Sequence, residues 1–242
     1  ETPQQIAQST LAGAGPGTPF GVVVGDDQGR GEVSIDPEGR YIPASNTKLF
    51  TTAAAFWKLG ALDQPDQLGG ASVWLVPGKG KVPSVELVGR GDARLSSAPD
   101  CKVACLAQLA DAIAARTRKV HHITGDDTHF VDQRWSLGMS WNNIPTRSGT
   151  GISALTLDDN EVKAVVTPGV VGKPPAVTLP AYFTVENTAQ TVAAEPSALG
   201  VDRMPGSRTV QVSGTLPATA PRIVTLGIDD PAEYAAWKLA EM

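Results

Sequence analysis

The sequence predicts a mixed α/β protein in which a short α/β portion precedes a long strand-rich region. The 25 Gly and 19 Pro residues make up 44 of the 242 positions, a composition typical of many turns and short strands with few long helices. An apolar hairpin and a helix occupy residues 19–60, whereas short strand patterns dominate residues 61–228. We therefore expect two kinds of region in one chain.

Composition and charge narrow the class of protein. Hydrophobic residues make up 41% of the chain and charged residues 19%, proportions typical of a soluble globular protein. The net charge of -5 and the pI of about 5.2 argue against a nucleic-acid partner, which would need a basic face. No apolar run approaches the roughly 18 residues of a membrane-spanning helix, so no transmembrane segment is expected. The chain starts at Glu1 rather than methionine, which a cleaved secretory signal would explain.

The first 60 residues predict a helix, a hairpin and a second helix. Residues 1–13 have the pattern of a short helix that ends at Gly13. Residues 19–45 predict an apolar strand, a Gly/Asp turn and a second strand. The helix expected from Ser45 onward has apolar residues at the 3.6-residue period and a glycine at its end. These positions are Leu49, Phe50, Ala53, Ala54, Trp57 and Gly60.

Short strands dominate the region that follows. Their patterns occupy residues 71–78, 84–92, 121–132, 176–180, 208–217 and 221–228. A helix is expected over residues 101–119, between the second and third of these strands. Asp158, Asp159 and Asn160 stand between apolar segments and predict a hairpin turn. Residues 61–228 are therefore expected to form a β-rich unit, distinct from the hairpin and helix before it.

Cys101 and Cys105 are the two cysteines of the chain. On the helix expected there, a spacing of four puts both on one face with Cα atoms about 6 Å apart, a distance that a disulfide tolerates. In an extracytoplasmic setting they either form a disulfide or remain two unpaired, largely buried thiols. A metal site would need two further ligands nearby, and none is evident.

The last residues predict one more helix. Asp230 is placed to cap its N-terminus, and Pro231 occupies its first position. The apolar pattern then continues to Met242 without a capping glycine or a polar tail. We therefore expect further sequence to follow, and the alternative is a native terminal helix.

Ser45 and Lys48 form a Ser-x-x-Lys motif in the first turn of the expected helix. A serine hydroxyl becomes a good nucleophile only when a neighbouring base takes its proton, and residues three apart on a helix share a face. Desolvation in a cleft would favour the neutral lysine amine that can act as this base. The alternative interpretation has Ser45 as a helix cap and Lys48 in solvent, and about half a match to the bare motif is expected by chance.

The residues around this motif, YIPASNTKLFTTAAAFWKLG, resemble the active-site segment of the class C low-molecular-mass penicillin-binding proteins, a D-alanyl-D-alanine carboxypeptidase/endopeptidase family. The resemblance continues in order through LVGRGDARL, ITGDDTHFVDQRW, GMSWNN, SALTLDDNEVKAVVTPG, VQVSGTLP and DDPAEYAAWKL. Ala93 departs from the pattern, since it stands where the family has a proline. Together the ordered blocks span essentially the whole chain.

The resemblance implies a mixed α/β fold that is part of a penicillin-recognising, serine transpeptidase-like (β-lactamase-like) α/β domain with a large β-rich insertion. Residues 1–60 would be the N-terminal part of the catalytic domain, with the Ser-x-x-Lys helix. Residues 61–228 would be the insertion, with room for two nested subdomains. Residues 229–242 would be a helix that returns toward the catalytic domain and is truncated here.

The resemblance also implies a serine-type D-Ala-D-Ala carboxypeptidase or endopeptidase that acts on peptidoglycan muropeptides, in the periplasm or after secretion. Ser45 would form the acyl-enzyme, Lys48 would act as the base for acylation, and β-lactam antibiotics would acylate the same serine. No metal or organic cofactor would be needed. The family's second and third motifs come after the last helix seen here, so a separate or missing C-terminal segment would complete the site. Without it the chain would be inactive and the Ser45 helix would expose apolar surface.

Two other segments imitate the family's second and third motifs. Ser140 and Asn142 give a Ser-x-Asn pattern, but a tryptophan stands between them. Residues 213–215 give Ser-Gly-Thr where Lys-Thr-Gly is needed. The resemblance places both segments in the β-rich insertion, so we expect neither to be catalytic.

The remaining candidates have structural interpretations. We expect surface histidines rather than metal ligands, turn-forming aspartates rather than acid–base partners, and tryptophans that pack in the core or at its rim. These residues are His121, His122 and His129; Asp92, Asp126 and Asp127; and Trp57, Trp74, Trp135, Trp141 and Trp237.

Two other functions stay open at this point. The chain could be a catalytically incomplete fragment or homologue whose β-rich region is a binding module. A β-lactamase or an esterase on the same scaffold would instead turn over nitrocefin or short esters rapidly.

Overall fold

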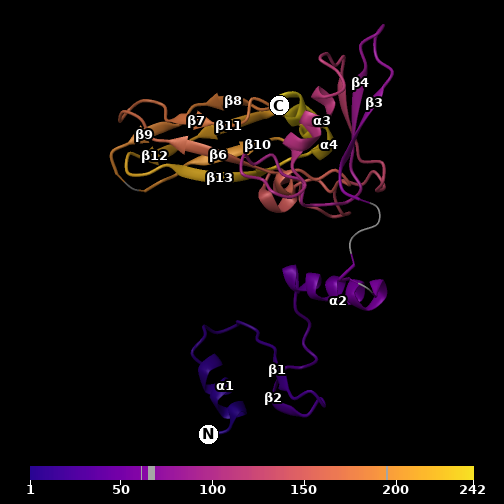
Figure 1. Ribbon diagram of the computed structural model, residues 1–242. Coiled ribbons are helices and arrows are strands. Elements are labelled where there is room, and N and C mark those ends of the chain that lie inside the picture. Colours follow the sequence, from indigo (N-terminus) through magenta and orange to yellow (C-terminus); the bar gives the residue numbers. More distant parts are fainter. Residues whose placement is uncertain (61, 65–68, 195) are drawn as a thin grey trace. The chain divides into compact units, whose positions relative to one another are not determined.

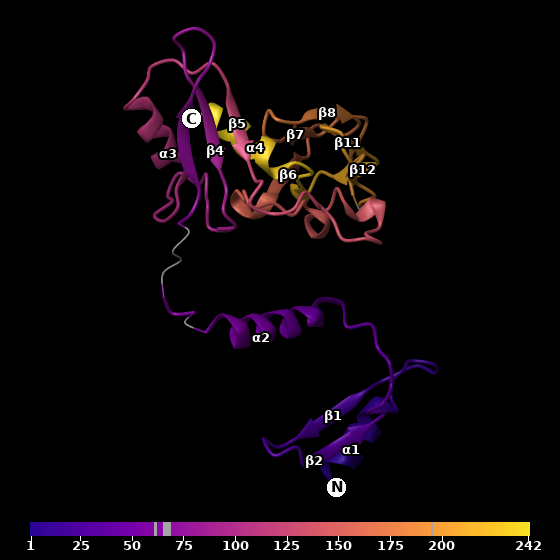
Figure 2. The same cartoon turned by 90° about the vertical axis from the view of Figure 1, so that its right-hand side faces the viewer.

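The structure, a computed structural model, describes residues 1–60, 62–64, 69–194 and 196–242. It divides into two compact units, Glu1–Pro65 and Asp66–Met242, and Figures 1 and 2 show their elements. No helix among the described residues is both long and apolar enough to cross a membrane.

The first unit is built from the elements that its sequence predicts. They are α1 (Pro3–Leu11), β1 (Val22–Gly25), β2 (Gly31–Ile35), a 3-10 turn (Ala44–Asn46) and α2 (Thr47–Leu59). α1 begins with a capping box, in which the Thr2 hydroxyl accepts from the Gln5 amide at 3.2 Å and the Gln5 side chain accepts from the Thr2 amide at 2.9 Å. β1 and β2 pair antiparallel, with Val22 opposite Ile35. The expected helix, hairpin and second helix are confirmed.

α2 is amphipathic but unburied. It ends at Gly60, whose φ of 67° would strain a residue with a side chain. No residue of α2 is buried, and Val33 is the only buried hydrophobic side chain among the described residues of the first unit. The expectation that this helix exposes apolar surface is confirmed. The exposed side chains are Leu49, Phe50, Phe56, Trp57 and Leu59.

The second unit contains four sheets of short strands within its described residues. One sheet has the order β3-β4-β5, from Ser72–Val76, Ser84–Val88 and Ile123–Asp126. Another has the order β13-β6-β7, from Arg222–Gly227, Glu161–Thr167 and Ala176–Thr178. The third has the order β10-β11-β8, from Gly200–Arg203, Thr209–Ser213 and Thr184–Asn187. The last pairs β12 (Thr215–Pro217) with β9 (Gln190–Val192). The short strands expected from the turn-rich composition are confirmed.

Two helices complete the second unit, α3 (Leu106–Ala114) and α4 (Pro231–Ala240). Asp230 caps α4 by accepting from the Glu233 amide at 3.0 Å, as the sequence predicts. α4 packs against β5 (Figure 2), so closely that a Cβ at Gly125 would overlap the backbone of α4. Six of its ten residues are buried, and four of these belong to the same core as residues of β4, β6 and β11. The return of residues 229–242 toward a catalytic domain stays a prediction.

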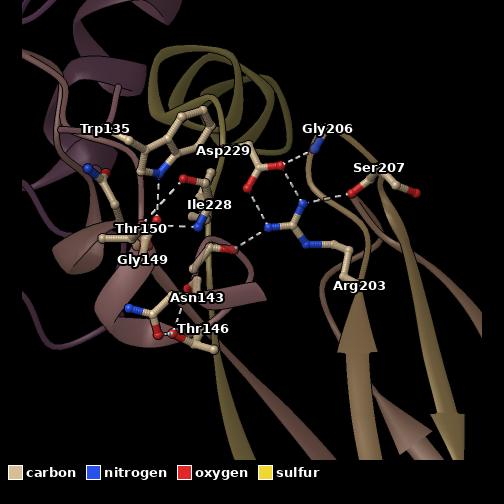
Figure 3. A network of polar contacts seen from close by, with 12 residues as sticks. Trp135, Asn143, Thr146, Gly149, Thr150, Arg203, Gly206, Ser207, Ile228 and Asp229 are labelled. Carbon is tan, nitrogen blue, oxygen red and sulfur yellow. Dashed lines mark hydrogen bonds and ion pairs between the residues drawn. The ribbon is translucent and has the colours of Figure 1, made fainter. Parts of the chain in front are cut away.

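A buried ion pair joins the β10–β11 hairpin to the end of β13 (Figure 3). The side chain of Arg203 is 2% exposed, and it donates to both carboxylate oxygens of Asp229 at 2.6 and 2.7 Å. Its terminal nitrogens also donate to the carbonyls of Ser207 and Gly227, at 2.8 and 3.0 Å. The amide of Gly206 donates to the same carboxylate. This network fixes the end of β13, after which the chain turns into α4.

The helix expected over residues 101–119 is shorter than predicted. α3 begins only at Leu106, because Cys105 has an extended backbone and forms an isolated bridge with Ser96. Cys101 and Cys105 form a disulfide, with Cα atoms 5.7 Å apart, so that alternative is confirmed. Both cysteines precede α3, so they do not share a helix face, contrary to the prediction.

The hairpin expected around residues 158–160 is also corrected. These three residues have φ of 49°, 59° and 53° and form a left-handed turn. The turn leads into β6, which pairs with β13 and β7 rather than with the residues before the turn. The Asp158 carboxylate accepts hydrogen bonds from the hydroxyls of Ser96 and Ser97. Contacts with a distant segment therefore hold a conformation that the local pattern does not show.

The tryptophans pack as expected only in part. Trp237 stacks within an aromatic cluster on α4, and the Trp135 indole donates to a backbone carbonyl at 2.6 Å. Core or rim packing was wrong for three others, which are 88%, 59% and 63% exposed: Trp57, Trp74 and Trp141.

Candidate active site

Ser45 and Lys48 lie in adjoining turns at the start of α2. Lys48 Nζ donates a 2.9 Å hydrogen bond to Ser45 Oγ, the contact that a spacing of three on a helix predicts. The N-cap of α2 is Asn46, and no side chain caps that end. Ser45 is therefore not the helix cap of the alternative interpretation.

The backbone just before Ser45 is strained. Ala44 has a φ of 44°, a left-handed conformation that costs an L-residue about 1–2 kcal/mol. Pro43, directly before it, has a φ of -72°, which its ring restricts. The chain therefore reaches Ser45 through a restricted residue followed by a strained one. Strained residues of this kind cluster at functional sites.

Both side chains of the pair are exposed in the first unit. The dry cleft that would favour a neutral lysine is therefore not formed by the described residues of this unit. The N-terminal end of α2 does supply a positive field, which favours an oxyanion close to Ser45. The contact that a serine nucleophile and a lysine base require is thus present, whereas the described residues of this unit leave Lys48 exposed to solvent.

The two motif imitations lie in the second unit. Ser140 Oγ donates to Asn142 Oδ1 at 2.7 Å. Ser213 ends β11, and Gly214 follows it with a φ of 82°. No lysine among the described residues hydrogen-bonds to either serine, so neither has the neighbouring base that an activated serine requires.

The three histidines do not come together. His121 and His122 line a groove between α3 and α4, and the ring of His129 lies 5.7 Å from that of Phe130. Among the described residues, no three His, Cys, Asp or Glu side chains gather in a way that could hold a metal ion.

The aspartates have structural partners. Asp92 and Asp126 each accept a hydrogen bond from the backbone amide two residues on, at 3.0 and 2.9 Å, which confirms their expected turn role. Asp127 instead forms an ion pair with Arg134 and accepts from the Ser153 hydroxyl at 2.7 Å. Burial opposes its charge, but these hydrogen bonds hold the pKa of Asp127 below its ordinary value. The carbonyl of Asp127 also accepts from the Phe130 amide at 3.2 Å, which confirms the expected turn, while its side chain ties two loops together.

Tyr41 and Asp36 were not among the residues predicted to form the site. The Tyr41 hydroxyl donates a 2.6 Å hydrogen bond to the Asp36 carboxylate. Tyr41 lies four residues before Ser45. The Asp-Pro-Glu-Gly run at residues 36–39 is a turn signal, and it was the one feature that could have drawn attention to this loop.

Comparison with known proteins identifies the family of this chain. The model of the D-Ala-D-Ala carboxypeptidase 3 (S13) family matches residues 3–242. The chain belongs to this family. This S13 chain is 38% identical over 237 residues to a D-alanyl-D-alanine carboxypeptidase of Actinomadura sp. (strain R39), and the match covers 90% of the chain but 42% of that relative. The family resemblance found in the sequence is confirmed.

Two solved structures share the fold. A crystal structure of penicillin binding protein 4 from Haemophilus influenzae matches with a TM-score of 0.68 and 21% identity, over 97% of this chain and 52% of that one. A second, of the same protein complexed with a novel β-lactam, matches with a TM-score of 0.60 and 19% identity, over 97% and 50%. These likenesses confirm the predicted mixed α/β fold. The S13 chain spans about half the length of the relatives it matches.

Proposed function

We propose that this S13 chain supplies the nucleophile and the base of a serine-type D-Ala-D-Ala carboxypeptidase or endopeptidase that acts on peptidoglycan stem peptides. The observation that carries the proposal is the 2.9 Å hydrogen bond from Lys48 Nζ to Ser45 Oγ, at the start of an apolar helix. Membership of the S13 family and the 38% identity to a carboxypeptidase support it.

The pair can carry out acyl transfer in two steps. Ser45 Oγ attacks the carbonyl carbon of the penultimate D-Ala while Lys48 Nζ accepts the hydroxyl proton. The C–N bond to the terminal residue breaks, the amine leaves with the proton returned from Lys48, and an ester remains on Ser45. Water then adds to the ester carbonyl, the bond to Ser45 Oγ breaks, one proton of the water passes to that oxygen to restore the hydroxyl, and the shortened peptide leaves as an acid. No metal or organic cofactor enters these steps.

A β-lactam would follow the first step only. Its ring amide opens when Ser45 Oγ attacks, and the amine stays tethered to the acyl group, so the ester on Ser45 persists. The structural neighbour that was crystallised with a β-lactam supports this assignment.

Lys48 can act as a base only if another surface packs on the first unit and removes water from its amine. A lysine amine is neutral near pH 7 only when desolvated or placed near other positive charge. We infer that a segment with the family's second and third motifs docks on the exposed apolar face of α2. In this arrangement residues 1–60 are the N-terminal part of the catalytic domain, residues 61–228 the β-rich insertion, and residues 229–242 the returning helix.

We also propose an extracytoplasmic location, either periplasmic or secreted. The proposed substrate lies in the cell wall, outside the cytoplasm. The disulfide between Cys101 and Cys105 is typical of proteins in oxidising compartments.

Labelling with a fluorescent penicillin, followed by mass mapping of the labelled peptide, tests the proposal in the protein as its gene encodes it. We expect the label on Ser45, no label in Ser45→Ala, and acylation slowed by about 10²–10⁴-fold in Lys48→Ala because the general base is lost. Ser140→Ala and Ser213→Ala are matched controls from the imitating motifs and should label normally. Normal labelling of Ser45→Ala would overturn the proposal.

The exposure of Ser45 and Lys48 favours one alternative, a catalytically incomplete chain whose β-rich region is a binding module. Labelling that needs a co-expressed C-terminal half would indicate a split or truncated enzyme. Absence of labelling in both cases would leave the binding module. Fast turnover of nitrocefin would instead indicate a β-lactamase.

A further inference from the structure

The loop between β2 and Ser45 folds back on the end of the hairpin. Asp36 directly follows β2 and has a left-handed φ of 45°. The Gly39 amide donates to the Asp36 carbonyl at 3.1 Å, which closes a turn over residues 36–39. Tyr41 follows this turn, and its hydroxyl donates a 2.6 Å hydrogen bond to the Asp36 carboxylate. The side chain of Tyr41 is thereby fastened to the strand that the chain has just left.

Two glycines make room for the Tyr41 ring. A Cβ added at Gly21 would lie 2.6 Å from Cε2 of Tyr41, and one at Gly39 would lie 2.7 Å from the same atom. Gly21 directly precedes β1, whose residue Val22 is opposite Ile35 of β2. The ring therefore contacts the start of β1 while its hydroxyl binds the residue after β2, so both strands of the hairpin hold it.

Along the chain toward Ser45, the bond from Tyr41 to Asp36 is the last hydrogen bond that holds the chain to the end of the hairpin. Residues 42–60 are all described, and their hydrogen bonds are local, with none that reaches β1 or β2. Ile42, next after Tyr41, is 93% exposed. Two residues later the strained Ala44, with its φ of 44°, leads directly into Ser45. The contacts of Tyr41 with the hairpin therefore set the path of the chain that leads to Ser45.

We propose that Tyr41 and Asp36 are positioning residues for the Ser45 nucleophile, with Gly21 and Gly39 providing the slot for the ring. This inference rests on the proposed acylation of Ser45. The hydrogen bond to Asp36 raises the pKa of Tyr41, so the hydroxyl remains a donor at neutral pH. Fixing the residue four positions before the nucleophile limits the conformations of the intervening strained segment. This favours the arrangement in which Ser45 Oγ meets Lys48 Nζ.

Three variants separate positioning from packing. Tyr41→Phe keeps the ring and loses the hydroxyl, and Asp36→Ala loses the acceptor. Asp36→Asn keeps an acceptor oxygen and tolerates a positive φ. The readout is acylation of Ser45 by a fluorescent penicillin in the protein as its gene encodes it, with the rate constant for acylation resolved from the affinity of the initial complex.

We expect Tyr41→Phe and Asp36→Ala each to slow acylation about tenfold, since misplacement of a reacting group lowers the rate without weakening the initial complex. The double variant should be no slower than either single one, and Asp36→Asn should stay within about threefold of the wild type. Tyr182→Phe is the matched control. It removes a tyrosine-to-carboxylate hydrogen bond of 3.0 Å to Glu233 in the second unit, and it should leave the acylation rate unchanged.

Several results would overturn the inference. If Tyr41→Phe is acylated at the wild-type rate, the hydroxyl does not position Ser45, while the proposed function would stand. An equal loss in Tyr41→Phe and Tyr182→Phe, or a loss confined to affinity, would show general destabilisation or a binding role instead. A wild-type protein that is not labelled on Ser45 would overturn the proposed function itself, and the positioning role with it. Circular dichroism of each variant should match that of the wild type.

Discussion

α2 and α4 both contain a tryptophan and several apolar side chains, yet they differ completely in burial. None of the 13 residues of α2 is buried, whereas six of the ten residues of α4 are. α4 packs on β5 and joins a core that runs through the second unit. The first unit instead has a single buried hydrophobic side chain within its described residues, Val33. The second unit is thus held together by burial, and the first mainly by local hydrogen bonds.

The difference shows that the apolar face of α2 could still be buried against another surface. Removing apolar surface from water is the dominant stabilising term in folding, and the exposed face of α2 has not yet contributed it. That same helix carries Ser45 and Lys48. We interpret the second unit as the stable part of the chain, and α2 as a helix that reaches its working environment only when another surface covers it.

The largest expected effect lies in the second unit, at Arg203. Arg203→Ala leaves two backbone carbonyls without this donor and the Asp229 carboxylate without its counter-charge. Breaking a buried ion pair costs about 3–5 kcal/mol. We expect a fall of that size in the free energy of unfolding, measured by chemical denaturation. Arg147→Ala is the matched control, because Arg147 pairs with Glu161 but its side chain is 70% exposed, and its loss should be below about 1 kcal/mol. Equal losses would contradict the assigned burial.

A leucine on each helix tests the comparison directly. Leu239 of α4 is 3% exposed and Leu49 of α2 is 68% exposed. In this 242-residue chain, Leu239→Ala should lower the free energy of unfolding by about 2–5 kcal/mol, because it leaves a cavity in the core. Leu49→Ala should change it by no more than about 0.5 kcal/mol. A large loss in Leu49→Ala would show that the α2 face is already covered, and the contrast between the helices would fail.

Acid titration gives the smallest effect. The hydrogen bond from Arg208 holds the pKa of Glu233 below its ordinary value of 4.5, and a second hydrogen bond from Tyr182 acts in the same direction. A carboxyl whose folded-state pKa is lowered stabilises the fold above its unfolded-state pKa, and this contribution is lost as pH falls through the folded-state pKa. We therefore expect stability of the second unit to fall below about pH 4.5.

Glu233→Gln should flatten this acid limb. The Glu233 side chain is 53% exposed, so the change in unfolding free energy should stay below about 1 kcal/mol. Glu241→Gln is the control at the end of the same helix, and it should follow the wild-type profile measured by thermal unfolding against pH. An acid limb that is identical in Glu233→Gln and wild type would show that the Glu233 carboxylate does not cause the loss of stability in acid.

The sequence predicted what depends on neighbouring residues. The capping of α4 by Asp230, the stop of α2 at Gly60 and the closeness of Ser45 to Lys48 all follow from spacings of a few residues. Each of these contacts forms within one or two helical turns, so the pattern of residue types is enough to predict it.

What the sequence did not predict depends on distant contacts. Arg203 and Asp229 are 26 residues apart, and the Asp158 carboxylate is held by hydroxyls more than 60 residues away. The start of α3 depends on a bridge between Ser96 and Cys105. The desolvation proposed for Lys48 would also depend on a distant surface, since the described residues of the first unit leave this side chain exposed.

The most direct test of the central claim, that Lys48 activates Ser45, is peptide mass spectrometry over time after addition of benzylpenicillin. We expect an adduct with the mass of one intact penicillin on the peptide that contains Ser45, formed much more slowly in Lys48→Ala. An adduct on another residue, or an unchanged rate in Lys48→Ala, would contradict it.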